Sequence, residues 1–373
     1  MKFTVSSTDL TQDLFMVSKA IAAKSTLPIL DNFLFVLEGN NLVITGSDSE
    51  TTFKTVIALE NVVEEGRITV PAKILTEAIK GLYTQPIEIS TDEEKKILNI
   101  IWQNGNANIP YMPADDYPQL KPLEEPKSIT LKANVLSNAI SNTIYATSDD
   151  YLRPAMNGIF FDLSEEQSNI VASNSHILVT FSIDAKGEKS SFSLPKKAAN
   201  LLKNALAKME EEDVEISYDS KFAYFKFDQN LLVSKLIEGN FPNYKAVIPQ
   251  HNENLLSISR ADLLNATRRV KVFANPATSQ IVLKLSFNQI EISTQDVAFS
   301  TSAREQLICE YNGTPMEISL KANFFEDILN NLPYEQIVLK FKDSTKPMLI
   351  VPAETESQEE KISVLLMPMI VTY

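Results

Sequence analysis

Few side chains in this sequence could carry out catalysis. It has two histidines, His176 and His251, and a single cysteine, Cys309. His176 lies between serines in the segment SNSHIL (173–178), which would suit a nucleophile and its base, but no Gly-x-Ser-x-Gly elbow surrounds it. The sequence has no His-x-x-x-His pair, cysteine cluster or EF-hand spacing. We therefore expect no catalytic residues, no metal and no cofactor, and we expect His176 to form hydrogen bonds or to line a pocket.

Composition argues against several classes of protein. The chain has 373 residues, 44% of them hydrophobic, which suggests two or three domains with cores of their own. Nine glycines are too few to favour a glycine-rich phosphate loop. No apolar run reaches the roughly 18 residues that a membrane span needs, and the start, MKFTVSSTDL, has no apolar signal segment. Because a lone cysteine cannot form an internal disulfide, we expect a cytoplasmic protein. Because no apolar segment is long enough to span a bilayer, we expect no membrane contact.

The last nine residues, LLMPMIVTY (365–373), are unusually apolar for the end of a chain. Terminal residues fray unless they dock against the protein. Met367 and Met369 flank Pro368, and methionine side chains suit a surface that adapts to several ligands. The pattern predicts a binding surface. The alternative is a plain edge strand whose methionines face the core.

The elements that would position these residues occur three times along the chain. One short segment appears as TVPAKILTEAIKGL (69–82), SLPKKAANLLKNAL (193–206) and SLKANFFEDILNNL (319–332). Each copy predicts a strand end followed by an amphipathic helix. Pro71 and Pro195 occupy matching places, where proline suits a first helical turn, whereas the third copy has Lys321.

Three further patterns repeat in phase with this segment. Each third of the chain opens with a strand that leads into a helix, continues with a two-strand hairpin pattern and closes with more strands. The openings are at 3–14, 129–140 and 256–267, the hairpins at 32–53, 157–181 and 279–300, and the closing strands at 87–103, 214–230 and 337–353. The candidate helix caps are Ser6 or Ser7, Asn134 and Ser259.

Together these patterns predict an α+β fold in which helices pack on antiparallel sheets in three repeated domains of about 125 residues. The predicted domains are 1–124, 125–252 and 253–373, with polar, proline-bearing linkers at 117–128 and 240–254. Three unrelated α+β domains are the alternative, but four in-phase matches argue against it.

On this triplicated frame, six segments in order resemble the bacterial DNA sliding clamp family, the beta subunit of DNA polymerase III. They are STLPILDNFLF (25–35), TVPAKILTEAIKGL (69–82), RPAMNGIFFDL (153–163), SNSHILVTFS (173–182), NFPNYKAVIP (240–249) and LLMPMIV (365–371). The resemblance spans the full length of the chain. It implies a non-enzymatic processivity factor in which each clamp-type chain forms half of a closed, head-to-tail homodimeric ring around duplex DNA. Helices would line the hole and sheets the outer rim.

The resemblance also implies a set of partners. They are double-stranded DNA, a second copy of the chain, the catalytic subunit of the replicative polymerase, an ATP-dependent clamp loader, and other polymerases and repair proteins that carry clamp-binding peptides. The expected location is the cytoplasm, in association with the nucleoid.

A ring that slides on DNA should offer only diffuse positive charge to the phosphates, because contacts with base edges would stop it. The net charge of −14 then places most acidic residues on the outside. Lys24 and Lys73 stand where the family has arginines near DNA, and Asp149 and Asp150 would repel phosphate. The predicted DNA-binding residues are Lys24, Lys73, Lys80, Asp150, Arg153, Pro154, Ala155, Lys196 and Lys197, and Arg268, Arg269 and Lys271 are further basic candidates.

The resemblance implies a groove for partner peptides, built from the chain end, the SNSH turn and the FPNY linker. Its matching residues are Met156, Ser173, Ser175, His176, Ile177, Leu178, Pro242, Val247, Leu365, Met367, Pro368, Met369 and Ile370. Ile177 and Ile370 stand where many family members have arginine, so this groove should be more apolar and could favour a different peptide motif.

Three residues are candidates for the subunit contact: Ile109, Val272 and Phe273. In the family such positions meet across the subunit boundary, and the alternative is that all three belong to the core. A second function also stays open at this point, namely a non-enzymatic interaction scaffold that keeps the groove but does not encircle DNA.

Overall fold

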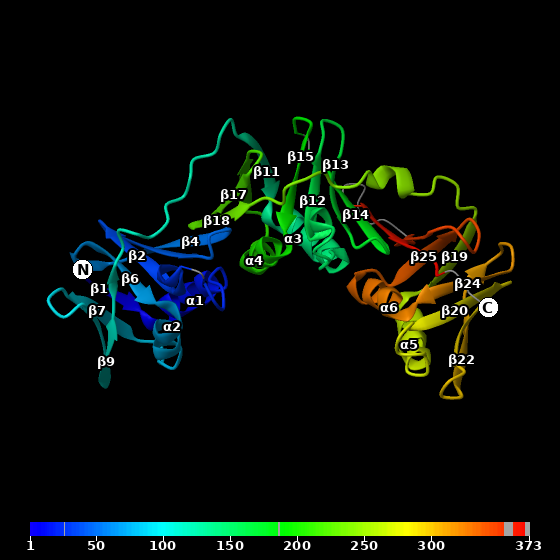
Figure 1. The fold of residues 1–373 in the computed structure, drawn as a ribbon, viewed down its shortest axis with the longest axis horizontal. Helices are drawn as coiled ribbons and strands as arrows, with labels where there is room; N and C mark the ends of the chain where they lie inside the picture. The colour runs from blue at the N-terminus through cyan, green and yellow to red at the C-terminus, as the bar shows by residue number, and fades with distance from the viewer. Residues whose placement is uncertain (26, 186, 354–360, 370–373) are drawn as a thin grey trace. The chain divides into compact units, whose positions relative to one another are not determined.

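The computed structural model describes residues 1–25, 27–185, 187–353 and 361–369 (Figure 1). They form two compact units. The first contains residues 1–134 and 200–236, and the second contains residues 135–199 and 237–373. The chain therefore passes between the units within its predicted middle domain.

Two antiparallel sheets build the first unit. One has the strand order β5-β1-β7-β8-β9 and the other the order β10-β6-β2-β3-β4-β18-β17-β16-β11. The strands are β1 (Lys2–Ser6), β2 (Asn32–Glu38), β3 (Asn41–Ser47), β4 (Thr51–Ala58), β5 (Asn61–Glu64), β6 (Gly66–Pro71), β7 (Pro86–Asp92), β8 (Ile97–Trp102), β9 (Gly105–Pro110), β10 (Met112–Pro113), β11 (Lys127–Lys132), β16 (Asp213–Tyr218), β17 (Phe222–Phe227) and β18 (Asn230–Lys235).

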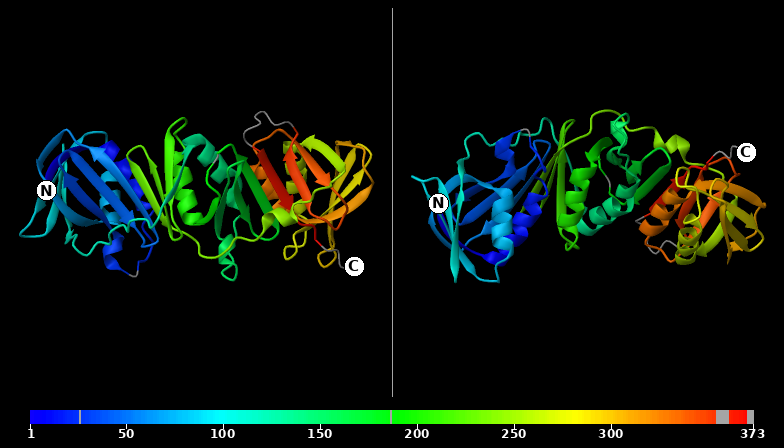
Figure 2. Two further views of the ribbon diagram at one scale, coloured as in Figure 1. Left: turned by 90° about the horizontal axis from the view of Figure 1, so that it is seen from above. Right: turned by 60° about the horizontal axis from the view of Figure 1, so that its bottom comes forward.

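Helices α1 (Ser7–Ser18) and α2 (Ala72–Lys80) pack side by side in this unit (Figures 1 and 2). Leu10, Leu14 and Val17 of α1 are fully buried, as is Leu75 of α2. Their three- and four-residue spacing puts them on one face of each helix, against the sheets. The opposite faces carry the polar and charged side chains.

The second unit also holds two antiparallel sheets, with the orders β15-β12-β13-β14-β27-β26-β25-β19-β23 and β22-β21-β20-β24. The strands are β12 (Gly158–Leu163), β13 (Ser168–Ser173), β14 (Ile177–Ile183), β15 (Ser190–Pro195), β19 (Asn254–Ser259), β20 (Gln280–Ser286), β21 (Gln289–Asp296), β22 (Thr301–Ile308), β23 (Glu310–Tyr311), β24 (Met316–Lys321), β25 (Gln336–Phe341), β26 (Met348–Pro352) and β27 (Lys361–Leu366). Helices α5 (Arg260–Lys271) and α6 (Ala322–Asn331) pack against each other here, in yellow-green and orange in Figure 2.

The middle repeat supplies helices α3 (Ala133–Thr143) and α4 (Lys196–Leu206). Short 3-10 turns occur at η1 (Pro28–Asp31), η2 (Ile144–Ala146), η3 (Pro154–Met156) and η4 (Tyr244–Val247). Within the described residues, no helix has the length and apolar character needed to cross a membrane.

The structure confirms the α+β fold and the strand-to-helix switches predicted from the repeats. Ser259 caps α5 by accepting a hydrogen bond from the Asp262 amide at 3.3 Å, whereas Ser6 forms no side-chain cap on α1. Pro71 and Pro195 are the last residues of β6 and β15 rather than part of a first helical turn. The predicted hairpin at 157–181 was too simple, because it contains β12, β13 and the start of β14. The domain limits at 124 and 252 stay predictions.

Close packing of α1 on β3 depends on Gly46, where a Cβ atom would lie 2.8 Å from the carbonyl oxygen of Val17. We expect Gly46→Ala to lower the free energy of unfolding by about 1–3 kcal/mol, because an extra carbon must push the helix off the sheet. Urea denaturation would measure it. Gly81→Ala is the matched control, since nothing lies within 4 Å of its added Cβ. Equal stability of the two variants would contradict this account of the packing.

Candidate functional site

Strand β27 and the described residues that follow it, up to Met369, lie where two repeats share a sheet. Strands β14 and β27 pair antiparallel, with Ile177 opposite Leu366 and Leu178 opposite Leu365. Beyond β27, the amide of Met367 donates to the carbonyl of His176 at 2.9 Å and the amide of Met369 to that of Ser319 at 2.7 Å. Two backbone hydrogen bonds therefore hold the tail against the turn between β13 and β14 and against β24, and Met367 stays 39% exposed.

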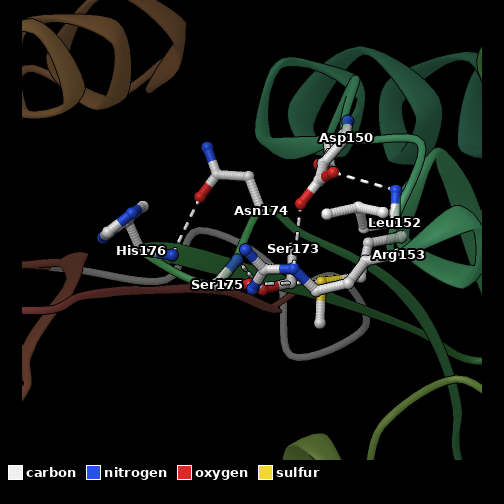
Figure 3. Close-up of polar contacts among 9 residues, drawn as sticks. Asp150, Leu152, Arg153, Ser173, Asn174, Ser175 and His176 are labelled. Atoms are coloured by element: carbon white, nitrogen blue, oxygen red, sulfur yellow. Dashed lines mark hydrogen bonds and ion pairs between the residues drawn. The ribbon is translucent and has the colours of Figure 1, made fainter.

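The turn between β13 and β14 is fixed by its own side chains (Figure 3). The Asn174 carboxamide oxygen accepts hydrogen bonds from the amides of His176 at 3.0 Å and Ile177 at 2.8 Å. Ser175 has a φ of +76°, in the left-handed region, so the turn stores some backbone strain. This conformation leaves the side chains of Ser175 and His176 exposed beside the tail.

The linker that begins at Phe241 covers the same region of the sheet. Phe241 stacks on Phe160 with 4.7 Å between ring centroids, and the Tyr244 hydroxyl donates to Asp162 at 2.6 Å. Burial and this carboxylate raise the pKa of Tyr244 well above its usual range. A core cluster is formed by Val171, Leu178, Tyr244 and Leu365. Pro242 and Val247, on the same linker, remain exposed.

Arg153 joins a second loop to this turn (Figure 3). Its Nη1 donates to the Ser175 hydroxyl, and its Nε donates to the Asp150 carboxylate at 3.1 Å. The Ser175 hydroxyl in turn donates to the sulfur of Met156 at 3.4 Å. Arg153, which was predicted to bind DNA, and Met156, which was predicted to line the groove, therefore both contact Ser175 of this turn.

An aromatic wall completes the site and was not predicted from the sequence. The ring of Phe324, on α6, stacks on His176 with 5.1 Å between centroids, and Lys321 lies 4.8 Å above the Phe324 ring. The available signal was the third copy of the repeated segment, where Lys321 replaces the proline of the other two. We call the region bounded by the tail, the turn, the linker and Phe324 the tail groove.

Two of the basic side chains around the tail groove, Arg153 and Lys245, are offset by acidic partners. Partial burial, followed by the positive charges of Lys321 and Arg153, lowers the pKa of His176 below its ordinary value. The protonated form of His176 is therefore disfavoured. The Arg153 charge is offset by Asp150, and Lys245 is offset by Asp162 at 2.8 Å. An apolar site with few polar groups suits the burial of leucine or phenylalanine anchors, each worth roughly 1.5–3 kcal/mol.

Two basic side chains of the first unit form no ion pair among the described residues. Lys24, in the loop after α1, and Lys73, on α2, are exposed, and among the described residues neither forms an ion pair. Lys80 is 3.5 Å from Glu77 on the same helix. A shallow pocket of about 500 Å³ lies between α1 and α2, and Lys73 and Lys80 are among its lining residues.

In the second unit, the predicted DNA-binding residues are largely neutralised by nearby acids. Asp149 pairs with Lys196 at 2.9 Å, and Asp150 pairs with Arg153. A hydrogen bond from the Leu152 amide, followed by the one from Arg153, lowers the pKa of Asp150. Pro154 is exposed and Ala155 half-buried in η3, and Lys197 is half-buried at the start of α4. Asp149 and Asp150, which were expected to repel phosphate, therefore each pair with a basic side chain of the same unit.

The basic residues at the end of α5 are paired as well. Arg268 and Lys271 both reach Glu326 on α6, at 3.0 and 2.8 Å. Arg269 forms a bidentate pair with Glu305 on β22. These pairs tie α5 to its neighbours. Because Arg268 and Lys271 share the one carboxylate of Glu326, the three basic residues are only partly offset by their two acidic partners.

Comparison with known proteins identifies the chain. Three family models match it in order: the N-terminal domain of the DNA polymerase III beta subunit at residues 1–121, the central domain at 130–243 and the C-terminal domain at 245–370. The chain belongs to the DNA polymerase III beta sliding clamp family. It is thus a DNA polymerase processivity factor of a non-catalytic family.

Individual relatives agree over the whole length. The beta sliding clamp of Staphylococcus aureus is 26% identical over 372 residues, covering 97% of this chain and 98% of that protein. The crystal structure of the Pseudomonas aeruginosa sliding clamp is 27% identical with a TM-score of 0.92, and that of Bacillus subtilis is 25% identical with a TM-score of 0.91. Each comparison covers 100% of both chains.

In this clamp, the predicted groove residues fall into two groups. Ile177, Leu178 and Leu365 are at most 4% exposed, so they form the floor beneath the groove rather than its accessible wall. Ser173 is buried too, and its hydroxyl donates to the Ile177 carbonyl at 2.8 Å. Pro368 and Met369 are half-buried in the tail. Ile370 lies outside the described residues.

The three candidates for the subunit contact differ in exposure. Val272 is 79% exposed and Phe273 43% exposed at the end of α5, so they are not core residues. Ile109 is 2% exposed on β9, opposite Leu98 of β8. The Ile109 side chain therefore packs inside its own domain, so at this position of β9 only the backbone is available to a partner.

The arrangement of the tail groove predicts how His176 titrates. We expect its NMR titration midpoint to lie below the ordinary value of about 6.5, and we expect Lys321→Gln to raise that midpoint by removing a nearby positive charge. Lys342→Gln is the control, because Lys342 does not contribute to the shift. A His251→Gln variant assigns the signal. A midpoint unaffected by Lys321→Gln would contradict the proximity of Lys321 to the groove.

Proposed function

We propose that two copies of this clamp close head to tail into a ring around duplex DNA, and that the tail groove tethers polymerases and other partners to it. The observation that carries the ring is the way the repeats join. Strand β4 of the first repeat pairs with β18 of the second, and β14 of the second pairs with β27 of the third.

Each joint uses the same two kinds of strand. The strands β4, β14 and β22 follow the first hairpin of their repeats. The strands β9, β18 and β27 are the third of the three strands that follow the second helix of each repeat. Among the described residues, β22 and β9 are paired on one side only, at the ends of their sheets. A second copy supplies the missing neighbour for each, and this heterologous contact closes after two chains in the proposed ring.

The proposed DNA contact is electrostatic and not specific for sequence. Lys24 and Lys73 form no ion pair among the described residues, whereas the basic residues of the second unit largely form such pairs. So few contacts with phosphate give weak binding to open DNA, and retention comes from encirclement. We place this activity in the bacterial cytoplasm at the nucleoid, with loading by an ATP-dependent clamp loader.

The tail groove supports docking of an extended peptide with apolar anchors. Its floor is buried and fixed by a shared sheet, while Met367, Pro242 and Val247 remain accessible. Adaptable methionines suit several ligands. We propose as its ligands the replicative polymerase catalytic subunit, the clamp loader, and other polymerases and repair proteins with clamp-binding peptides.

A topological experiment tests the ring. The clamp is loaded onto nicked circular DNA with a clamp loader and ATP, free protein is removed in high salt, and the circle is then cut once. We expect the clamp to stay on intact circles and to leave after the cut. Equal loss from intact and cut circles would favour the alternative, an interaction scaffold that does not encircle DNA.

The charge distribution predicts which lysines matter for DNA. We expect the double variant Lys24→Glu and Lys73→Glu to load less well and to lower the salt dependence of DNA binding by about one unit per lysine, because each lost phosphate contact releases fewer counterions. Binding of partner peptides should be unchanged. The control is Lys95→Glu with Lys346→Glu, which changes the net charge equally in exposed turns. Equal loading of the two double variants would remove Lys24 and Lys73 from the DNA surface.

The limits of β27 predict the effect of shortening the chain. Deleting residues 367–373 removes the tail but keeps Leu365 and Leu366, and therefore keeps the pairing of β27 with β14. We expect at least a tenfold loss of affinity for partner peptides, since losing one apolar anchor contact already costs about 1.5 kcal/mol or more. Fluorescence polarisation measures the peptide, and light scattering should still report a dimer. Unchanged peptide affinity would refute the groove assignment.

A further inference from the structure

The turn between β3 and β4, in the first unit, is built like the turn of the tail groove. The Asp48 carboxylate accepts hydrogen bonds from the amides of Glu50 at 3.0 Å and Thr51 at 2.7 Å. Asn174 accepts the same two bonds in the other turn. The residue after Asp48, Ser49, lies in the left-handed region with a φ of +79°, as Ser175 does in the tail groove. The same turn therefore precedes β4 and β14.

The end of β18 corresponds to the start of the tail. There the Lys235 amide donates to the Glu50 carbonyl at 2.7 Å. This bond is the counterpart of the one that the Met367 amide donates to the His176 carbonyl. An acidic side chain therefore takes the place of the histidine in the first unit, and a lysine takes the place of the methionine.

The linker after β10 repeats the linker that covers the tail groove. Tyr117 is buried in one apolar cluster with Leu34, the third residue of β2. Tyr244 packs on Phe160, the third residue of β12, with 6.4 Å between ring centroids. The two tyrosines therefore anchor their linkers at equivalent places on the two sheets.

These equivalences define a second surface, which we call the first-joint surface because it lies beside the pairing of β4 with β18. Two exposed leucines belong to it. Leu120 follows Tyr117 by three residues, as Val247 follows its own tyrosine, and is 39% exposed. Leu27 directly precedes η1, as Arg153 precedes η3, and is 47% exposed. The surface therefore offers accessible apolar side chains to a partner.

The first-joint surface differs from the tail groove in charge. Glu50 is exposed in the turn, and Asp115 and Asp116 are exposed on the linker. These carboxylates outnumber the lysine at the end of β18. In the tail groove, by contrast, the positive charges of Lys321 and Arg153 lie close to the histidine. The first-joint surface therefore attracts basic side chains and repels DNA.

We propose that the first-joint surface is a second docking site, for a segment of a partner protein that carries an apolar anchor between lysines or arginines. The inference rests on the proposed role of the tail groove, whose construction it shares, and it adds another site and another class of peptide. The anchor covers Leu27 and Leu120, and the basic residues on either side reach Glu50 and Asp115. Because the two sites use different residues, one chain can hold a peptide at each.

Fluorescence polarisation with two labelled synthetic peptides tests this proposal on the full-length clamp. Both peptides carry the same two leucines, which are flanked by lysines in one and by glutamates in the other. We expect the lysine peptide to bind at least about tenfold more tightly than the glutamate peptide. Glu50→Lys combined with Asp115→Lys should weaken binding of the lysine peptide about tenfold, because each change replaces an attraction by a repulsion.

The matched control for charge is Glu60→Lys with Glu94→Lys, which changes the net charge equally at exposed positions of the same unit. It should leave the affinity for the lysine peptide nearly unchanged. Leu120→Ser tests the apolar contact without changing the charge, and it should also weaken binding. Thermal melting by circular dichroism confirms that each variant is folded. Equal weakening by the two double variants, equal affinity for the two peptides, or no binding of the lysine peptide would overturn the proposal.

The clamp that lacks residues 367–373 separates this site from the tail groove. Unchanged affinity of this shortened chain for the lysine peptide supports a separate site. Loss of that affinity overturns the proposal, because the peptide then occupies the tail groove. Failure of the tail groove assignment would appear differently, as unchanged affinity of the shortened chain for the partner peptides.

Discussion

Antiparallel strand pairing across the joints between repeats is the interaction on which the other features of this clamp depend. Backbone hydrogen bonds cross each joint, and large apolar pairs such as Phe53 with Leu232 seal it on the helix side. A sheet that passes from one repeat to the next excludes water from its interior and holds the two repeats in one register. Edge strands are normally a liability, but in this fold each internal edge is used to attach the neighbouring repeat.

The tail groove is a consequence of one such joint. Because β14 and β27 are neighbours, the turn that precedes β14 lies next to the tail that follows β27. Neither repeat could build the groove alone, since His176 comes from the second and its stacking partner Phe324 from the third. The scaffold is rigid where it is paired, and the accessible side chains at its surface are adaptable. That combination suits a site that receives several peptides in turn.

The local electrostatic potential at the surface of this clamp depends more on which basic side chains form ion pairs than on the net charge of −14. Asp149, Asp150 and Glu326 hold basic side chains of the second unit in fixed positions. Such exposed pairs add little stability, but they reduce the positive potential near the loop at Arg153. Lys24 and Lys73 form no ion pair among the described residues, so the positive potential around them is not reduced in this way. A surface with a few uncompensated charges attracts a polyanion without gripping it, which is the requirement for sliding in the proposed ring.

By itself, the sequence determined the repeat, the α+β class and the order of strands and helices, because these follow from local periodicity that recurs about every 125 residues. It also pointed to Met367, His176 and the linker from Phe241 as parts of one surface, through resemblance to a family. It did not show that Ile177 and Leu178 lie buried beneath the tail groove and do not line its accessible surface. Their burial depends on the pairing of β14 with β27, which the sequence does not reveal. The sequence also did not reveal that Arg153, which it placed with DNA, donates a hydrogen bond to Ser175, because the two residues are 22 positions apart in the chain. Phe324 and the neutral pairing of Asp149 were likewise decided by tertiary structure, since both depend on contacts between segments that are distant in the chain.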